Sequence, residues 1–175
     1  MGFTLEAFVA DARAAAAAAD PLAAVTRLMA DTLADPARVA AGAPTPDRDE
    51  TCLFEDATVS VWHERFQPDV ELPPHDHAMP AVLGVYQGRE RNRLWHRVDG
   101  LARPGGALVL EAGGFHVFGP DDIHSVHAED GAPSLGLHVY LGPLTTVPRS
   151  LFDWETGAAI PLTGANFETL LRPLS

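Results

Sequence analysis

Apolar side chains recur at helical spacing in the first part of the chain. Between residues 3 and 42 they lie three and four positions apart, which places them on one face of a helix. These apolar positions are Leu5, Phe8, Val9, Ala12, Leu22, Val25, Leu28 and Met29. Asp20-Pro21 and Asp35-Pro36 interrupt the stretch, and such a pair suits a helix start because Asp accepts a bond from a free N–H while Pro fits the first helical position. The pattern predicts three short helices that meet at these two dipeptides.

From Thr51 onward the pattern changes to short runs rich in β-branched and aromatic residues, separated by Gly, Pro and Asp. The runs are residues 52–55, 58–66, 81–88, 91–98, 106–111, 124–128 and 135–141. No helical pattern lies between them, which is typical of an antiparallel sandwich or small barrel. We therefore expect a single domain in which a helical segment, residues 1–42, packs on a mainly β barrel, residues 51–175.

The end of the barrel segment carries a weaker pattern. A further hairpin is expected to turn near Gly157. Beyond it, an apolar tail through Phe167, Leu170 and Leu171 is expected to pack back on the sheet.

Composition removes several classes of function. The chain has 175 residues, of which 46% are hydrophobic, and this suffices for one core. A formal charge of -12 would repel a nucleic-acid backbone or an anionic membrane surface. No lysine is present, so a P-loop lysine or a Schiff base is not available. One series of arginines has the spacing of a solvated strand face: Arg89, Arg91, Arg93 and Arg97.

Cysteine use and the alanine-rich run bear on location. Cys52 is the only cysteine, which excludes an intramolecular disulfide and suits a reducing compartment. The first residues carry no export signal. The alanine run at 14–19 is far shorter than the ~20 apolar residues of a membrane-spanning helix. We expect a cytoplasmic protein with neither membrane nor nucleic acid as a partner.

His75 and His77 are the first candidates for chemistry. In an extended strand, side chains two positions apart point to the same face, whereas on a helix they diverge by roughly half a turn. A His-x-His pair followed by the apolar run 81–88 therefore suits one metal ion approached from a strand.

The same segment carries a family resemblance. His75-x-His77, then Gly88, then GGFHVFGPDDIH at residues 113–124, resemble the two motifs of the cupin superfamily. The second motif is matched at Gly114, Pro120 and His124. The first lacks the glutamate ligand expected after His77. The resemblance implies a cupin double-stranded β-helix, a jelly-roll barrel, with three histidine ligands: His75, His77 and His124. A shift of the third ligand to His127 stays open, although a regular strand would point it to the opposite face.

Within the cupins, the chain is similar to the thiol dioxygenases, the group of cysteine dioxygenase and 3-mercaptopropionate dioxygenase. The similarity covers residues 53–150 and includes GLHVY at 136–140. It implies that His138 and Tyr140 belong to a catalytic Ser-x-His-x-Tyr triad, in which Gly136 replaces the serine. It also implies that Arg149 holds the substrate carboxylate. Two alternatives stay open: His138 as a buried histidine bonded by the backbone, and Arg149 as a surface arginine at a hairpin edge.

The expected function is that of a non-haem iron(II) enzyme. It would use O2 to convert a small carboxylate-bearing thiol, of the cysteine or 3-mercaptopropionate type, to its sulfinic acid. Three neutral imidazoles leave Fe(II) its full positive charge, which favours an anionic thiolate. The alternatives are another three-histidine cupin dioxygenase and a non-catalytic metal-binding or small-molecule-binding cupin. We expect a monomer or a homodimer.

Overall fold

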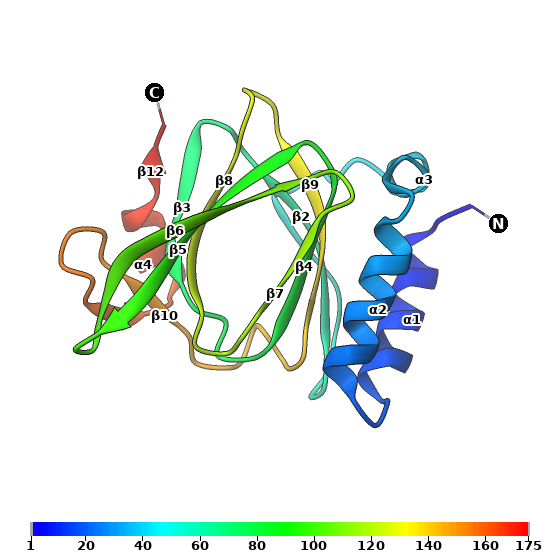
Figure 1. Ribbon diagram of the computed structural model, residues 1–175, viewed down its shortest axis with the longest axis horizontal. Helices are drawn as coiled ribbons and strands as arrows, with labels where there is room; N and C mark the ends of the chain where they lie inside the picture. Colours follow the sequence, from blue (N-terminus) through cyan, green and yellow to red (C-terminus); the bar gives the residue numbers. More distant parts are fainter. Residues whose placement is uncertain (1, 175) are drawn as a thin grey trace.

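Two antiparallel sheets face each other in the computed structural model, which describes residues 2–174 (Figure 1). One sheet has the strand order β1-β2-β9-β4-β7, and the other has the order β11-β10-β3-β8-β5-β6, with β12 beside β3. The strands are β1 (Glu50–Glu55), β2 (Ser60–Phe66), β3 (Val70–His75), β4 (Ala81–Gln87), β5 (Arg89–Val98), β6 (Leu101–Glu111), β7 (Phe115–Phe118), β8 (Ile123–Ala128), β9 (Ser134–Tyr140), β10 (Ser150–Phe152), β11 (Ala159–Pro161) and β12 (Arg172–Pro173). The predicted mainly β double-stranded β-helix with N-terminal helices is confirmed.

The three N-terminal helices begin where the sequence pattern places them. They are α1 (Leu5–Ala16), α2 (Pro21–Leu33) and α3 (Pro36–Gly42). The Asp20 carboxylate accepts a hydrogen bond from the N–H of Ala23, and the Asp35 carboxylate accepts one from the N–H of Arg38. In both helices Pro occupies the first turn, where its missing N–H is not needed.

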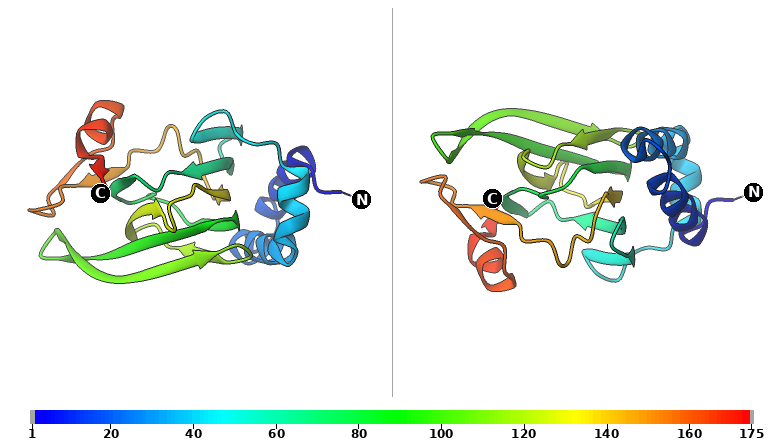
Figure 2. Two further views of the ribbon diagram at one scale, coloured as in Figure 1. Left: turned by 90° about the horizontal axis from the view of Figure 1, so that it is seen from above. Right: turned by 90° about the horizontal axis from the view of Figure 1, so that it is seen from below.

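These helices cover the outer face of the sheet that contains β4 and β9, at the end of the molecule away from the C-terminus (Figure 2). Their buried side chains include Phe8, Val25 and Met29, which pack with Val82 and Leu137 of that sheet. Contact is close because a side chain at Gly84 of β4 would meet both Leu33 and Met29. The helices therefore close the back of this sheet, and its inner face is left to line the barrel.

All seven predicted runs fall on strands, but the sequence pattern misses other elements. Strand β3 lies outside these runs because Pro73 and Pro74 lack the N–H of a strand ladder, and only the spacing of His75 and His77 predicted a strand here. The hairpin at Gly157 is present as β10 and β11. The apolar tail that follows forms a short helix, α4 (Gly164–Leu170), which contacts β3.

The arginine series of β5 is more than a solvated face. The side chains of Arg89, Arg91, Arg93 and Arg97 are 37–48% exposed. Each also makes an ion pair, with Glu129 for the first two, with Glu71 for Arg93 and with Asp76 for Arg97.

Within residues 2–174, no helix combines the length and the apolar character needed to cross a membrane.

Candidate metal centre

Three buried histidines, two on neighbouring strands and one in the loop that follows β3, meet inside the barrel. His75 is the last residue of β3 and lies directly opposite His124 of β8, while His77 follows two residues after the end of β3. Their three nitrogen ligand atoms all lie within 4.8 Å of one another. His75, His77 and His124 are thus brought together as a group that could hold a metal ion.

The local backbone differs from the predicted regular strand. Strand β3 ends at His75, so His77 lies in the loop that follows, close to Ala78, whose φ of 55° is left-handed. The β3–β8 pairing also shifts register between Leu72 and His75, where Pro73 and Pro74 add an extra residue to β3. A bulge and a loop, rather than alternation along one strand, aim the two histidines at the same point.

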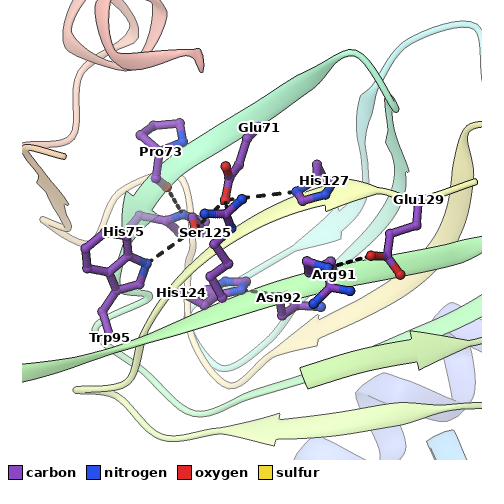
Figure 3. Close-up of polar contacts among 11 residues, drawn as sticks. Glu71, Pro73, His75, Arg91, Asn92, Trp95, His124, Ser125, His127 and Glu129 are labelled. Atoms are coloured by element: carbon purple, nitrogen blue, oxygen red, sulfur yellow. Dashed lines mark hydrogen bonds and ion pairs between the residues drawn. The ribbon is translucent and has the colours of Figure 1, made fainter. Parts of the chain in front are cut away.

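Two of the three imidazoles are oriented by hydrogen bonds from the far side of the ring. The Nδ1 of His75 lies 2.9 Å from the carbonyl oxygen of Pro73, and the Nδ1 of His124 lies 2.8 Å from the Oδ1 of Asn92 (Figure 3). Both partners are acceptors, so we assign the proton to Nδ1 and the lone pair to Nε2. Such contacts are typical of metal-binding histidines because they fix the ring and its tautomer.

Burial keeps all three rings neutral. It lowers the pKa of His75 to about 4, and it lowers the pKa values of His77 and His124 well below the ordinary value of histidine. Neutral imidazoles are the form that binds metal. The ring of Phe118 packs against His124 with centroids 4.4 Å apart, which keeps the imidazole in place. The donor set fits a divalent transition metal, with no carboxylate in the group.

His127 lies on the other face of β8, as the strand pattern predicts. Its Nδ1 is 4.0 Å from the Oε1 of Glu71, on the side of the strand opposite Asn92 (Figure 3). Glu71 also accepts a hydrogen bond from Ser125. His127 therefore belongs to a separate polar cluster and is not part of the three-histidine group.

The remaining sequence candidates line one cavity with the three histidines. This cavity has a volume of about 240 Å³ and includes His138, Tyr140 and Arg149 in its wall. His138 and Tyr140 come from β9, and Arg149 directly precedes β10. The aromatic ring of Tyr140 lies 5.1 Å from the ring of His77, measured between centroids.

His138 and Tyr140 contact each other without the triad serine. The Nδ1 of His138 lies 3.2 Å from the Tyr140 hydroxyl. Burial lowers the pKa of His138 to about 3 and raises the pKa of Tyr140 well above its usual value, so both are neutral. At Gly136, a Cβ would lie 2.8 Å from the carbonyl oxygen of Gly84 and 3.2 Å from the Nε2 of His138. A serine would therefore force β4 and β9 apart, and glycine fits this close approach.

Arg149 is connected to the three-histidine group through hydrogen bonds between its neighbour Ser150 and Asp76. The carboxylate of Asp76, which lies between the two histidines of the His-x-His pair, accepts hydrogen bonds from the N–H of Ser150 and from the guanidinium of Arg97. The N–H of Asp76 in turn donates to the carbonyl of Ser150. The Arg149 guanidinium has no carboxylate within 4.0 Å among residues 2–174, although Glu50 and Glu64 line the same cavity. It is a half-buried cation without an ion pair.

The cavity is also lined by three residues of β2 that belong to no sequence motif: Trp62, Glu64 and Phe66. Alternation along β2 could have placed these three on one face, because they are two positions apart. It could not have shown that this face is the inner one. His63, on the other face of β2, lies 2.6 Å from the Tyr86 hydroxyl and takes no part in the cavity.

Comparisons of sequence find no matching protein-family model and no matching curated protein. Comparisons of structure do find matches. A protein of Bacillus halodurans aligns with a TM-score of 0.50 at 15% identity, over 65% of this chain and 78% of its own. A protein with a double-stranded β-helix domain from Klebsiella pneumoniae subsp. pneumoniae MGH 78578 aligns with a TM-score of 0.48 at 14% identity, over 62% and 83%.

A third match is an RmlC-like cupin family protein with a double-stranded β-helix fold from Methanocaldococcus jannaschii, with a TM-score of 0.48 at 10% identity, over 58% of this chain and 89% of its own. Identities this low bear on the fold alone. The strand order and the two facing sheets are those of a double-stranded β-helix. The chain has a double-stranded β-helix fold, and its barrel carries a three-histidine group able to hold a metal ion.

Proposed function

We propose that this protein is a non-haem iron(II) thiol dioxygenase that converts a small carboxylate-bearing thiol to its sulfinic acid. The observation that carries the proposal is Arg149, a cation without an ion pair among residues 2–174, in the wall of the cavity that contains the three-histidine group. A guanidinium binds a carboxylate through two parallel hydrogen bonds, which fixes both position and orientation.

The ligand set supports iron bound to a thiol. His75, His77 and His124 would hold the ion through neutral nitrogens, so no ligand charge offsets that of the metal. When bound, Fe(II) would supply a cation that favours the ionised form of a thiol and the redox capacity to react with dioxygen. Arg149 would anchor the other end of the substrate and direct the sulfur towards the histidines.

Tyr140 and His138 would supply the polar contact beside the reacting atoms. If His138 carries its proton on Nδ1, it donates to the Tyr140 oxygen and leaves the phenolic O–H free to donate into the cavity. The Nε2 of His138 has no partner among residues 2–174, which suits a lone pair facing Gly136 better than an N–H. The Tyr140 hydroxyl would then stabilise negative charge that develops on oxygen during the reaction.

The overall reaction balances without a further reductant. A thiol, RSH, and O2 give RSO2H, so both oxygen atoms end on sulfur and the thiol proton is retained by the acid. Sulfur loses four electrons and the two oxygen atoms gain four. The protein therefore needs only the metal, the thiol and O2.

Oxygen uptake by purified, iron-loaded protein with 3-mercaptopropionate, L-cysteine and cysteamine tests this function. We expect uptake with the two carboxylate-bearing thiols and one sulfinic acid formed per O2 by mass spectrometry. Arg149→Ala should raise KM for 3-mercaptopropionate by about 10- to 100-fold, because a charge-assisted bidentate contact is lost. Cysteamine, which has no carboxylate, is the matched control, and any oxygen uptake that it supports should be equal in wild type and Arg149→Ala.

No thiol-dependent uptake above the metal-free control would contradict the proposal. Uptake with a carbon substrate such as a diketone would instead indicate another three-histidine cupin dioxygenase. Failure of the purified protein to retain any first-row transition metal would favour a non-catalytic small-molecule-binding role.

A further inference from the structure

We propose that Glu64 is a specificity-determining residue that binds a positively charged amine on the substrate. This inference rests on the proposed function and narrows its substrate to thiols that carry an ammonium group as well as a carboxylate. The site consists of Glu64 in the barrel wall, Glu50 beside it at the rim, and Arg149 in the same cavity.

Glu64 differs from the other buried glutamates in having no partner. Its side chain is 5% exposed and lines the cavity, yet it forms no hydrogen bond or ion pair with any residue from 2 to 174. The two comparable residues are both bonded: Glu71 accepts from Ser125 at 2.9 Å, and Glu90 accepts from Ser134 at 3.1 Å. A buried carboxyl without a partner is unfavourable, and a ligand group that pairs with it removes that penalty.

The neighbours of Glu64 make a cation the suitable partner. In the β1–β2 pairing Glu50 lies directly opposite Glu64, so two acidic side chains stand on adjacent strands on the same face. Like charges in such a pair destabilise a sheet unless a cation lies near them. Burial first, and then the charges of Glu50 and Glu90, raise the pKa of Glu64 well above its ordinary value, although the charge of Arg149 acts in the opposite direction. An ammonium group in the cavity would restore the charged form.

The position of Glu64 also gives it access to a ligand. It lines the cavity of about 240 Å³ that contains the three-histidine group, and its cross-strand neighbour on β9 is Gly136. No metal-binding group in residues 2–174 includes Glu64 or Glu50, so an organic cation suits the pair better than a second metal ion. With Arg149 in the same wall, the cavity presents a cation and buried acid, which matches the opposite charges of an amino acid.

L-cysteine and 3-mercaptopropionate test the inference because they differ only by the amine. We expect iron-loaded wild-type protein to show a higher kcat/KM for L-cysteine. In Glu64→Gln, kcat/KM for L-cysteine should fall at least tenfold, about 1.4 kcal/mol, while that for 3-mercaptopropionate stays within about twofold. Glu155→Gln removes the same charge from an exposed turn and should leave both values unchanged.

Calorimetric titration of zinc-loaded protein with the same two thiols gives a second measurement that does not depend on turnover. The dissociation constant of L-cysteine should rise at least tenfold in Glu64→Gln, about 1.4 kcal/mol, and that of 3-mercaptopropionate should not. If no thiol supports oxygen uptake, the proposed function fails and the titration alone decides the role of Glu64.

Two results would overturn the inference. Equal losses for both thiols would mean that Glu64 only maintains the structure of the barrel. Tighter binding of 3-mercaptopropionate with unchanged binding of L-cysteine would mean that Glu64 serves as a counter-ion for Arg149, and that its removal frees the guanidinium.

Discussion

The Nε2 atoms of His77 and His124 lie 3.3 Å apart in the interior of the barrel. His124 already uses its Nδ1 in the contact with Asn92, so its Nε2 presents a lone pair towards His77. Two neutral rings in this arrangement need a proton or a cation between them. The Nδ1 of His77 has no partner among residues 2–174, so this ring can change tautomer and offer its own lone pair to a metal.

Removing His77 should abolish metal retention. His77→Ala deletes one of three ligands, and the two that remain cannot enclose an ion from three sides. Elemental analysis of the purified variant is expected to show less than about a tenth of the wild-type metal content, in line with the loss of a primary ligand. His127→Ala is the matched control, because that ring lies on the opposite face of β8. Equal metal content in both variants would show that His77 is not a ligand.

Asn92 should control metal affinity without touching the metal. Its Oδ1 accepts from the Nδ1 of His124, and loss of such a contact typically weakens binding by about 10–100-fold. Competition with a chromophoric chelator measures the affinity of Asn92→Ala. Asn92→Asp keeps an acceptor and should bind metal more tightly than the alanine variant. An alanine variant with unchanged affinity would show that packing alone orients His124.

Loss of the Tyr140 hydroxyl should reduce turnover while sparing the metal. Tyr140→Phe keeps the ring next to His77 and removes only the group that contacts His138. We expect kcat to fall about 100-fold, the range seen when one donor to developing negative charge is removed. Metal content, measured on the same preparation, should match wild type. A fully active variant would rule out this role for the hydroxyl.

Glu90 should make the metal-free protein less stable at higher pH. Burial raises the pKa of Glu90 from 4.5 to about 7, and the hydrogen bond from Ser134 offsets only part of this. Between these two values the folded state holds a proton that the unfolded state has lost, so the free energy of unfolding falls as pH rises. Full loss would amount to about 3 kcal/mol.

Urea denaturation of wild type and Glu90→Gln at several pH values measures this effect. Glutamine keeps the acceptor for Ser134 and has no charge to bury. The variant should be more stable than wild type at pH 8, by about 3 kcal/mol at most, and the difference should shrink towards pH 4. A difference that does not change with pH would show that Glu90 is not the titrating group.

Sequence patterns predicted those helices and strands that a few neighbouring residues determine. Asp20 and Asp35 mark helix starts because one side chain and the proline after it determine the first turn. The strands at 81–88 and 135–141 stand out because one face of each packs on the helices and the other lines the barrel. Strand β3 was harder to recognise because Pro73 and Pro74 hide it. Helix α4 was missed because its apolar positions are few.

The site residues that belong to sequence motifs could be predicted, and those outside the motifs could not. His75, His77 and His124 are linked by spacing that a family resemblance can interpret, and the structure places them together. Glu64 belongs to no motif, and a glutamate in an alternating strand resembles a solvent-facing residue. Only the closure of the barrel shows that it points inward, next to Glu50.

Asp76 connects the three-histidine group with Arg149. The carboxylate and the peptide N–H of Asp76 join the loop of His77 to Ser150, the neighbour of Arg149 in the chain. A metal ion that orders the histidines is therefore expected to order the Arg149 guanidinium as well. Because coupling between two binding sites is reciprocal, a bound carboxylic acid should in turn raise the affinity for the metal ion. Ion and acid are therefore expected to assist each other's capture even though they touch different side chains.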